Sequence, residues 1–132
     1  MLAHNVGKKK CNSSGESPIE YQHRAIGGSR ATHEQWFQND AGKWRVADGV
    51  RGNTAYEAKF VTGKWGDSLY NPKSVTTPKG FEAHSRNLAQ MIDYSNKFDT
   101  VVYISNSKAL LQSIRRMAKA NNLRNVRARF RR

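Results

Sequence analysis

The chain has 132 residues, with 23 Lys and Arg against 10 Asp and Glu, so its formal net charge is +13. This length suits one domain with a modest core. The charge excess predicts a polyanionic partner such as nucleic acid, an anionic membrane surface or an acidic protein. The single cysteine, Cys11, excludes an internal disulfide and a cysteine-rich zinc site. The sequence has no run of about 18 apolar residues, so no membrane span is expected.

The N-terminal segment, residues 1–17, is rich in Lys, Asn, Ser and Gly and has little apolar surface to bury. We therefore predict a flexible leader or linker there. Ser17 and Pro18 are typical of a helix start, with Ser as the N-cap and Pro in the first turn. The predicted helix covers about residues 19–25 and ends at Gly27, because Gly is the usual residue past a helix end.

Three strand-like runs follow, with a turn signal between each run and the next. The runs cover residues 33–38, 43–48 and 54–61. The turn signals are the Asn-Asp-Ala-Gly stretch at 39–42 and the Gly-Asn pair at 52–53. Strands joined in succession by short turns predict an antiparallel meander.

The third run alternates, which places Glu57 and Lys59 on one face of the strand, about 7 Å apart. The turn before it folds Asp48 back, so two carboxylates and an ammonium are expected to converge. Mg²⁺ binds through one or two carboxylates, polarises a phosphoryl oxygen and lowers the pKa of a bound water. A lysine nearby stabilises developing negative charge. This arrangement predicts phosphodiester cleavage; the alternative is a solvated ion pair without a function.

Residues 62–80 form a long irregular segment that mixes aromatic side chains with lysines. Loops of this length inside a domain are usually functional or disordered. Aromatic rings among lysines suit stacking on bases and pairing with phosphates, whereas Trp65 and Tyr70 could also pin the loop to the core. The candidate nucleic-acid contacts of this segment are Lys64, Trp65 and Lys73.

The C-terminal half has the pattern of a helix, a strand, a second helix and a second strand. The first helix is predicted over residues 81–97. The strand at 100–105 has an unbroken apolar sequence, which indicates burial on both faces. Asn or Ser at 106–107 caps the second helix, which ends at the Asn pair 121–122. The last strand covers 125–131, and the strand–helix–strand order favours a parallel crossover.

Apolar spacing in these elements defines the expected core. In the first helix, Phe81, Leu88, Met91, Ile92 and Ser95 lie on one stripe at a spacing near 3.6 residues. The second helix has one at Leu110, Leu111, Ile114, Met117 and Ala118. In the last strand the inward positions are Val126, Ala128 and Phe130, while the outward positions are Arg127, Arg129 and Arg131.

The basic residues are segregated, because the segment from Thr100 to the end contains nine Lys and Arg and no Asp or Glu. Such segregation favours contacts along a phosphate backbone over mere solubility. The alternative is a docking face for an acidic protein. The candidate nucleic-acid contacts of this segment are Arg115, Arg116, Arg127 and Arg129.

The order of elements and the acidic motif together resemble the restriction-endonuclease-like phosphodiesterase superfamily, which is named for its PD-(D/E)xK motif. Asp48 matches the first acid of the motif, Glu57 the second and Lys59 the lysine. The resemblance implies an α/β (α+β) fold over residues 18–132. Its restriction-endonuclease-like core would be a mixed sheet with an antiparallel meander, flanked by helices.

A narrower similarity is to toxin domains of this fold at the C-termini of bacterial polymorphic toxins. The chain has their motifs in the same order, at Tyr21-Gln22, Gly27, Trp36, Asp48-Gly49 and Glu57-Ala58-Lys59. It departs from the pattern at Ala47, where the motif has Pro, and at Phe60, where Gly is frequent. By resemblance, Glu20 matches an extra acid on the first helix, and Gln90 with Tyr94 matches a polar pair on the helix after the motif.

The resemblance implies a metal-dependent endonuclease that is delivered into rival bacterial cells and acts in the target-cell cytoplasm. A cognate acidic immunity protein would neutralise it. DNA is favoured over RNA as the substrate, and Mg²⁺ or Mn²⁺ is the implied cofactor. Asp48, Glu57 and the carbonyl of Ala58 would hold the metal, and Lys59 would assist the attacking water. Gln22 is a further catalytic candidate, and the second-tier candidates are Glu20, Gln90 and Tyr94.

Two rival functions are open at this point. One is a metal-independent ribonuclease toxin that uses a histidine and a basic group as acid and base; its candidates are His23, His33 and His84. The other is a non-catalytic nucleic-acid-binding module, which would bind nucleic acid without cleaving it. Chelation of the metal by EDTA would abolish cleavage by the metal-dependent nuclease and leave cleavage by the ribonuclease unchanged.

Overall fold

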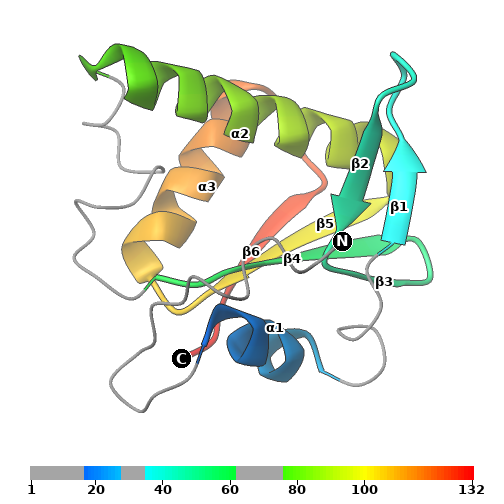
Figure 1. Cartoon of the computed structure of the whole chain (residues 1–132), viewed down its shortest axis with the longest axis vertical. Coiled ribbons are helices and arrows are strands. Elements are labelled where there is room, and N and C mark those ends of the chain that lie inside the picture. The colour runs from blue at the N-terminus through cyan, green and yellow to red at the C-terminus, as the bar shows by residue number, and fades with distance from the viewer. Residues whose placement is uncertain (1–16, 28–34, 62–75) are drawn as a thin grey trace.

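The computed structural model describes residues 17–27, 35–61 and 76–132, which contain three helices and six strands (Figure 1). In chain order the elements are α1 (Pro18–Ile26), β1 (Gln35–Gln38), β2 (Trp44–Ala47), β3 (Gly49–Arg51), β4 (Thr54–Lys59), α2 (Pro78–Lys97), β5 (Thr100–Ser105), α3 (Lys108–Ala120) and β6 (Val126–Phe130). None of these described helices is both long enough and apolar enough to cross a membrane. Three predicted features lie outside the described residues. They are residues 1–16 of the predicted leader, the candidate His33, and the segment that contains Lys64, Trp65 and Lys73.

The described strands form two sheets rather than the single meander that the sequence predicted. β3, β4, β5 and β6 make a mixed four-stranded sheet in that order. β3 is antiparallel to β4, whereas β5 is parallel to both β4 and β6. β1 and β2 form a separate antiparallel hairpin. The predicted mixed α+β architecture and the parallel crossover through α3 are therefore confirmed, and the continuous meander is wrong.

The meander is interrupted at Asp48, which lies between the end of β2 and the start of β3. The main-chain N–H of Ala58 in β4 donates to Asp48 Oδ2 over 2.9 Å. The Asp48 carboxylate thus accepts a hydrogen bond from an amide that would donate to a main-chain carbonyl if the ladder continued. The ladder ends there, and β2 pairs with β1 instead. The resulting bend brings an acidic side chain to the edge of β4.

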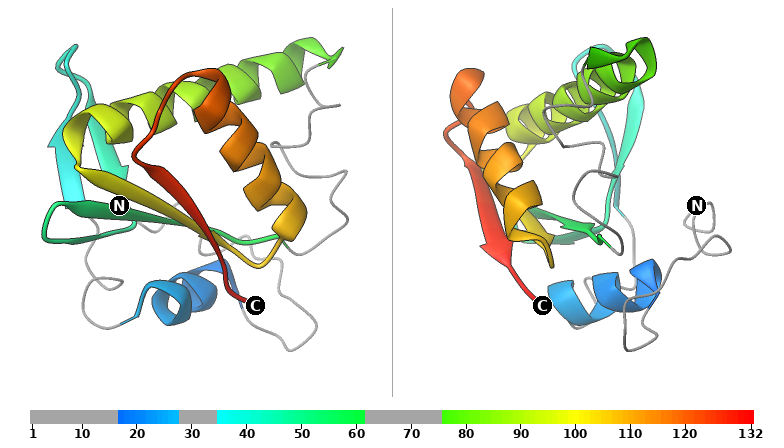
Figure 2. Two further views of the ribbon diagram at one scale, coloured as in Figure 1. Left: turned by 180° about the vertical axis from the view of Figure 1, so that it is seen from behind. Right: turned by 90° about the vertical axis from the view of Figure 1, so that its left-hand side faces the viewer.

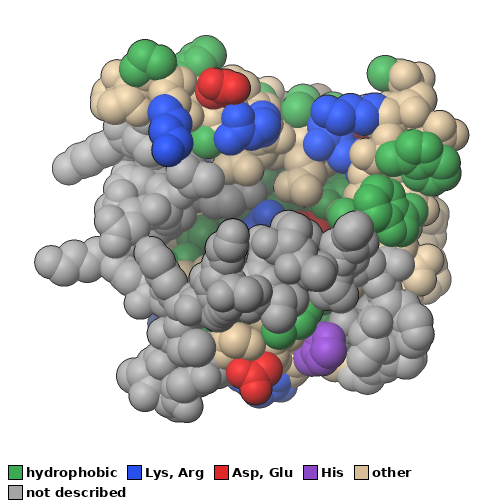
Figure 3. Space-filling model, in the orientation of Figure 1, with side chains coloured by type: hydrophobic (Ala, Val, Ile, Leu, Met, Phe, Trp, Pro, Cys, Tyr) green, Lys and Arg blue, Asp and Glu red, His purple; other side chains and the backbone are tan. Residues whose placement is uncertain are grey.

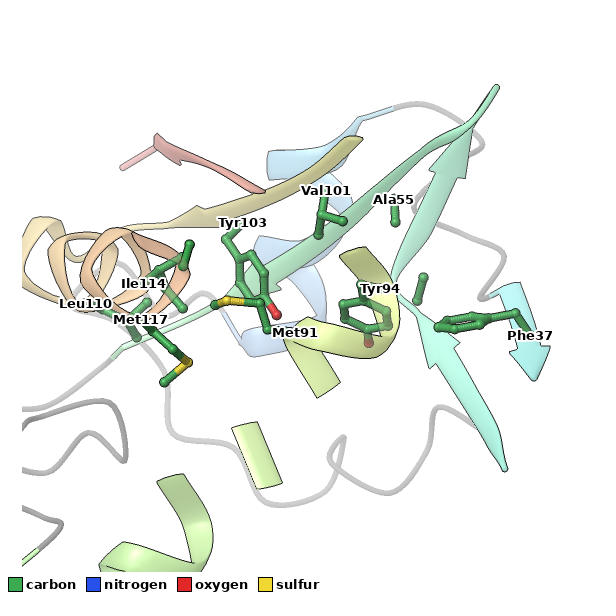
Figure 4. Packing of buried hydrophobic residues seen from close by; sticks show 11 residues of the cluster. Phe37, Ala55, Met91, Tyr94, Val101, Tyr103, Leu110, Ile114 and Met117 are labelled. Atoms are coloured by element: carbon green, nitrogen blue, oxygen red, sulfur yellow. The ribbon is translucent and has the colours of Figure 1, made fainter. Parts of the chain in front are cut away.

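Helices cover both faces of the four-stranded sheet (Figures 1 and 2). Because side chains alternate across a strand, neighbouring residues of β5 enter different cores. Val101 and Tyr103 belong to the core with α2 and α3, which Figure 4 shows, whereas Val102 and Ile104 pack with α1. The predicted burial of this strand on both faces is confirmed.

Local capping explains the ends of the helices. Ser17 Oγ accepts from the N–H of Glu20 over 3.2 Å, and the Glu20 carboxylate accepts from the N–H of Ser17 over 2.8 Å, which forms a capping box. After α1, Gly27 has a φ of 81°, a conformation that favours glycine. Ser107 caps α3 by accepting from the N–H of Leu110 over 3.1 Å. Both helices lie where the sequence predicted them.

The predicted apolar stripe of α2 is only partly right. The helix begins at Pro78, and its buried residues are Gly80, Ala83, Met91 and Tyr94. Phe81 is 62% exposed, because each residue turns a helix by about 100° and Phe81 follows the buried Gly80 directly. Phe130 is also exposed, with the Lys108 ammonium 5.0 Å from its ring centre. The predicted stripe of α3 is buried as expected.

Candidate active site

Asp48 and Glu57 interlock where β2, β3 and β4 meet. Gly49 pairs with Tyr56, so Asp48 lies opposite Glu57 at the next position. The main-chain N–H of Asp48 donates to Glu57 Oε1 over 3.1 Å, and the N–H of Ala58 donates to Asp48 Oδ2 over 2.9 Å. Each carboxylate is thus fixed by the main chain of the other strand. The structure brings together the two acids that the sequence pattern singled out.

Lys59 adds a positive charge to the same point. Its Nζ lies 3.3 Å from Glu57 Oε2, and its side chain is 24% exposed. Glu57 itself is only 3% exposed. A charge is buried at high cost unless it is paired and hydrogen-bonded, so this pair differs from the solvated ion pair considered as the alternative. Figure 3 shows a recess below α2 in which acidic and basic side-chain atoms are visible.

Tyr94 on α2 connects the helix to both strands. Its hydroxyl lies 2.9 Å from Glu57 Oε1 and 2.7 Å from the Val46 carbonyl oxygen, and it accepts from Gln90 Nε2 over 3.0 Å. A phenol has one proton to share between the two acceptors, and the bond to the carboxylate is the stronger because it is charge-assisted. Burial, and then the negative charge of Glu57, raises the pKa of Tyr94. The hydroxyl therefore remains a donor well above neutral pH.

α1 approaches the same junction from the other face of the sheet. Gln22 Nε2 lies 3.5 Å from the carbonyl oxygen of Asp48, which is at the outer limit of a hydrogen bond. This contact is possible because Asp48 lies at the edge of the sheet, where helices on both faces can reach. Gln22 thus contacts the main chain of the bend.

The oxygen donors at the junction fit a hard cation. Residues 17–27, 35–61 and 76–132 contain no group of three or more His, Cys, Asp and Glu that could hold a metal ion. Mg²⁺, however, is commonly held by one or two carboxylates and keeps waters or substrate phosphates. Asp48 and Glu57 supply two carboxylates. The carbonyl of Ala58 points to the same edge of β4 as its N–H, towards Asp48. A donor set made only of oxygen suits Mg²⁺ and Mn²⁺.

Two arginines predicted to contact nucleic acid project from the other face of the sheet. Arg127 and Arg129 of β6 pair with Val102 and Ile104, so their side chains lie on the α1 face. Glu57 lies on the face covered by α2, where its carboxylate meets Tyr94. The β6 arginines and the acidic junction therefore do not form one continuous surface on a single face.

The other predicted residues among those described lie on the three helices. Glu20 has its carboxylate in the capping box of α1. Arg115 and Arg116 are exposed on α3. His23 and His84 lie on α1 and α2, which pack on opposite faces of the sheet. The histidines among the described residues therefore do not come together.

Sequence reasoning missed the contacts that hold the β1–β2 hairpin on α2. Asp93 Oδ2 accepts from Arg45 Nε over 2.7 Å and from Asn39 Nδ2 over 3.0 Å. The Phe37 ring packs on Tyr94 with its centre 5.6 Å away. No local pattern connects residues so far apart in the chain. The position of Tyr94, three residues after the apolar Met91, is the one signal that its ring would face the core.

Comparison of the chain with protein-family models, with curated proteins and with solved structures finds no match in any of the three. The functional assignment therefore depends on the geometry of Asp48, Glu57, Lys59 and Tyr94.

Proposed function

We propose that this chain is a Mg²⁺-dependent endonuclease, with Mn²⁺ as an alternative metal, and that Asp48, Glu57 and Lys59 form its catalytic centre. The observation that carries the proposal is the buried Glu57 carboxylate. It accepts hydrogen bonds from the Asp48 N–H and the Tyr94 hydroxyl and pairs with Lys59. Packing alone would be served by an apolar residue, because burying a charged group costs free energy. The buried charge is therefore better explained by a functional role than by stability.

Each residue of the junction has a role in phosphodiester hydrolysis. Asp48 and Glu57, with the Ala58 carbonyl, would hold the metal, which when bound polarises a phosphoryl oxygen and lowers the pKa of a water. The hydrogen bonds to Glu57 fix its carboxylate, so little reorganisation is needed as charge develops. Lys59, which is partly exposed beside Glu57, neutralises charge that builds up on the phosphate oxygens. Tyr94 remains protonated and acts through Glu57 as a positioning residue.

The net charge and the motif support a nucleic-acid substrate and a toxin role. A chain of charge +13 attracts a polyanion. The hairpin with Asp48 and the Glu57-Ala58-Lys59 triplet, followed by α2 and the parallel strands β5 and β6, is similar to the restriction-endonuclease-like superfamily and its polymorphic toxin domains. On that resemblance we propose a toxin domain that is delivered into rival bacteria and degrades nucleic acid in their cytoplasm, with DNA favoured over RNA. A cognate acidic immunity protein would neutralise it.

The rival functions have less support from the described residues. A metal-independent ribonuclease needs an acid and a base at one point. His23 and His84 lie on opposite faces of the sheet, so they cannot form such a pair with each other. A module that only binds nucleic acid needs surface charge and has no use for a buried carboxylate at a bend.

Digestion of plasmid DNA and of total RNA tests the proposal. Wild type, Glu57→Gln and Glu82→Gln are compared in Mg²⁺ and in EDTA. Glu82 is the matched control, because its exposed carboxylate lies 3.3 Å from Arg86 on the surface of α2. We expect Glu82→Gln to cleave like the wild type, and Glu57→Gln to lose on the order of 100-fold or more while circular dichroism shows it folded.

Other outcomes of the digestion would favour the rival functions. Cleavage that persists in EDTA would support the metal-independent ribonuclease, and binding without cleavage by the wild type would support the non-catalytic module. Expression of the wild type in bacteria tests the toxin role. Cell killing that Glu57→Gln abolishes and Glu82→Gln retains is the expected result.

A further inference from the structure

The outer face of the β1–β2 hairpin presents two tryptophans to solvent. Trp36 pairs with Val46, and Gln38 pairs with Trp44. Paired residues of antiparallel strands project to the same face, so these four side chains share the outer face. Trp36 is 53% exposed and Trp44 is 58% exposed. They are diagonal neighbours across the two strands, which places their α-carbons about 7–8 Å apart.

Contacts on the inner face hold the hairpin in this orientation. Phe37 and Ala47 are buried there, and Arg45 pairs with Asp93 of α2. Because this inner face is fixed against the helix, the indoles cannot turn into the core. Large aromatic side chains grouped on one exposed face usually mark a binding surface.

The tryptophan face leads directly to the acidic junction. β2 ends at Ala47, and Asp48 follows it. At about 3.3 Å per residue, Trp44 lies about 13 Å along the chain from Asp48. Trp36 lies on the neighbouring strand opposite Val46, which is about 7 Å along the chain from Asp48. Figure 3 shows hydrophobic side chains over the hairpin on the same side of the molecule as the recess with charged side chains. A strand bound in the recess would therefore pass the indoles.

We propose that Trp36 and Trp44 form a stacking platform for unpaired nucleobases of the strand whose phosphate enters the acidic junction. This inference rests on the proposed nuclease function and specifies its substrate as single-stranded or locally unpaired nucleic acid. Bases stack on aromatic side chains irrespective of sequence, and positive charge nearby attracts the phosphates. The four outward residues carry no charge that would repel the phosphates.

The charge of the chain also decides between possible occupants of this face. A second copy of the chain would bring +13 against +13, which opposes association. A nucleic acid strand has the opposite charge and supplies flat apolar bases for the indoles. The occupant that fits both the charge and the shape is an unpaired strand.

Binding in EDTA tests the platform separately from catalysis. Fluorescence anisotropy measures the affinity for a short labelled DNA strand, the same sequence as RNA, its duplex, and a DNA strand with abasic positions. The variants are Trp36→Ala, Trp44→Ala and, as a control, Phe81→Ala, which removes an exposed aromatic ring from α2. We expect each tryptophan change to weaken single-strand binding by about 5- to 100-fold and Phe81→Ala to leave it unchanged.

The abasic strand makes the test specific for stacking. It keeps every phosphate, so the wild type should bind it more weakly than the normal strand, and each tryptophan variant should distinguish the two strands less than the wild type does. Trp36→Tyr and Trp44→Tyr should restore most of the affinity. Tryptophan-dependent binding of DNA or of RNA supports the platform and identifies the sugar of its ligand.

Several results would overturn the platform. Unchanged strand affinity in both alanine variants is one of them. A change in sedimentation without a change in strand binding is another, since it would assign the face to a second copy. If the cleavage rate in Mg²⁺ is the same in both alanine variants as in the wild type, the proposed nuclease function stands and the proposed platform is rejected. Tryptophan-dependent binding without any cleavage would retain the platform and reject the nuclease.

Discussion

The hydroxyl of Tyr94 lies 2.9 Å from Glu57 Oε1 and 2.7 Å from the Val46 carbonyl oxygen. One side chain of α2 therefore contacts both β4, which carries Glu57, and β2, which carries Trp44. The ring of Tyr94 also packs on Phe37 of the hairpin. The tyrosine therefore contacts both the hairpin and the acidic junction.

Tyr94→Phe keeps the ring packing and removes the hydroxyl. We expect the free energy of unfolding to fall by about 1–3 kcal/mol, because the buried Glu57 carboxylate loses a donor. The Mg²⁺ concentration required for half-maximal cleavage should rise, since that carboxylate is held less firmly. Urea denaturation and metal titrations of the cleavage rate measure the two effects. Unchanged metal dependence would contradict the positioning role.

The raised pKa of Tyr94 predicts how stability changes at alkaline pH. In the unfolded chain tyrosine releases its proton near its ordinary value of 10.0, whereas in the folded protein burial and Glu57 keep Tyr94 protonated. Below pH 10 both states keep the proton, so the stabilisation is fully present there. Above it the unfolded state binds fewer protons, and stability falls by about 1.4 kcal/mol per pH unit from this group. Tyr94→Phe should show a smaller alkaline decline in urea denaturation at pH 9–11.

Lys59→Met separates the role of the lysine from metal binding. The change keeps the length of the side chain and removes the charge 3.3 Å from Glu57 Oε2. We expect cleavage to fall on the order of 100-fold, because the charge on the phosphate is no longer neutralised. Mn²⁺ binding measured by calorimetry should persist, since both carboxylates remain. A cleavage rate like that of the wild type would contradict a catalytic role for Lys59 and would favour an ion pair with Glu57 that has no function.

Asp93→Asn tests the anchor of the hairpin. It removes the charge that accepts from Arg45 and Asn39, and bonds to a charged group are worth about 1.5–3 kcal/mol. We expect faster hydrogen exchange in residues 35–47, with β5 still protected. Glu82→Gln is the control, because its exposed pair with Arg86 one helical turn away contributes at most about 0.5 kcal/mol. Equal exchange in both variants would show that the anchor is unimportant.

The face of the sheet on which the β6 arginines lie predicts how they affect the binding of nucleic acid. Arg127 and Arg129 project on the α1 face, opposite the acidic junction. A short oligonucleotide held at the junction should therefore bind Arg127→Ala/Arg129→Ala with an unchanged salt dependence. A long duplex that extends past the edge of the sheet should show a shallower salt slope, by about 0.9 for each phosphate that an arginine no longer neutralises. A shallower slope with the short strand would place these arginines in the site.

Much of the fold follows from local signals in the sequence. Ser17 with Glu20 three residues later marks the start of α1, and the unbroken apolar run at 100–105 marks a strand between two parallel neighbours. Glu57 and Lys59 are brought together by alternation along a single strand, which is why a two-residue spacing is sufficient to predict their pairing. Gly52, with a φ of 60°, provides the turn that folds Asp48 back.

The sequence could not predict features that depend on distant contacts. The pattern predicts a continuous meander because nothing in it shows that an aspartate side chain will replace a main-chain acceptor at the bend. The pattern places Phe81 in the core because Phe81 is the most hydrophobic residue of the first turn. In the structure the buried face of that turn carries Gly80 and Ala83 instead. The exposure of Trp36 and Trp44 is likewise not visible from composition, since tryptophan is more often largely buried.

The parallel pairing of β4 with β5 has a consequence for the order of folding. Thr54 pairs with Thr100, and Val101 pairs with Val126, so these ladders join distant parts of the chain. Such contacts form slowly, whereas a hairpin between neighbouring strands forms within microseconds. Glu57 and Lys59 on β4 therefore complete their sheet pairing only after residues 100–105 are available to pair with them. For the nuclease that we propose, activity is expected only once β5 has paired with β4.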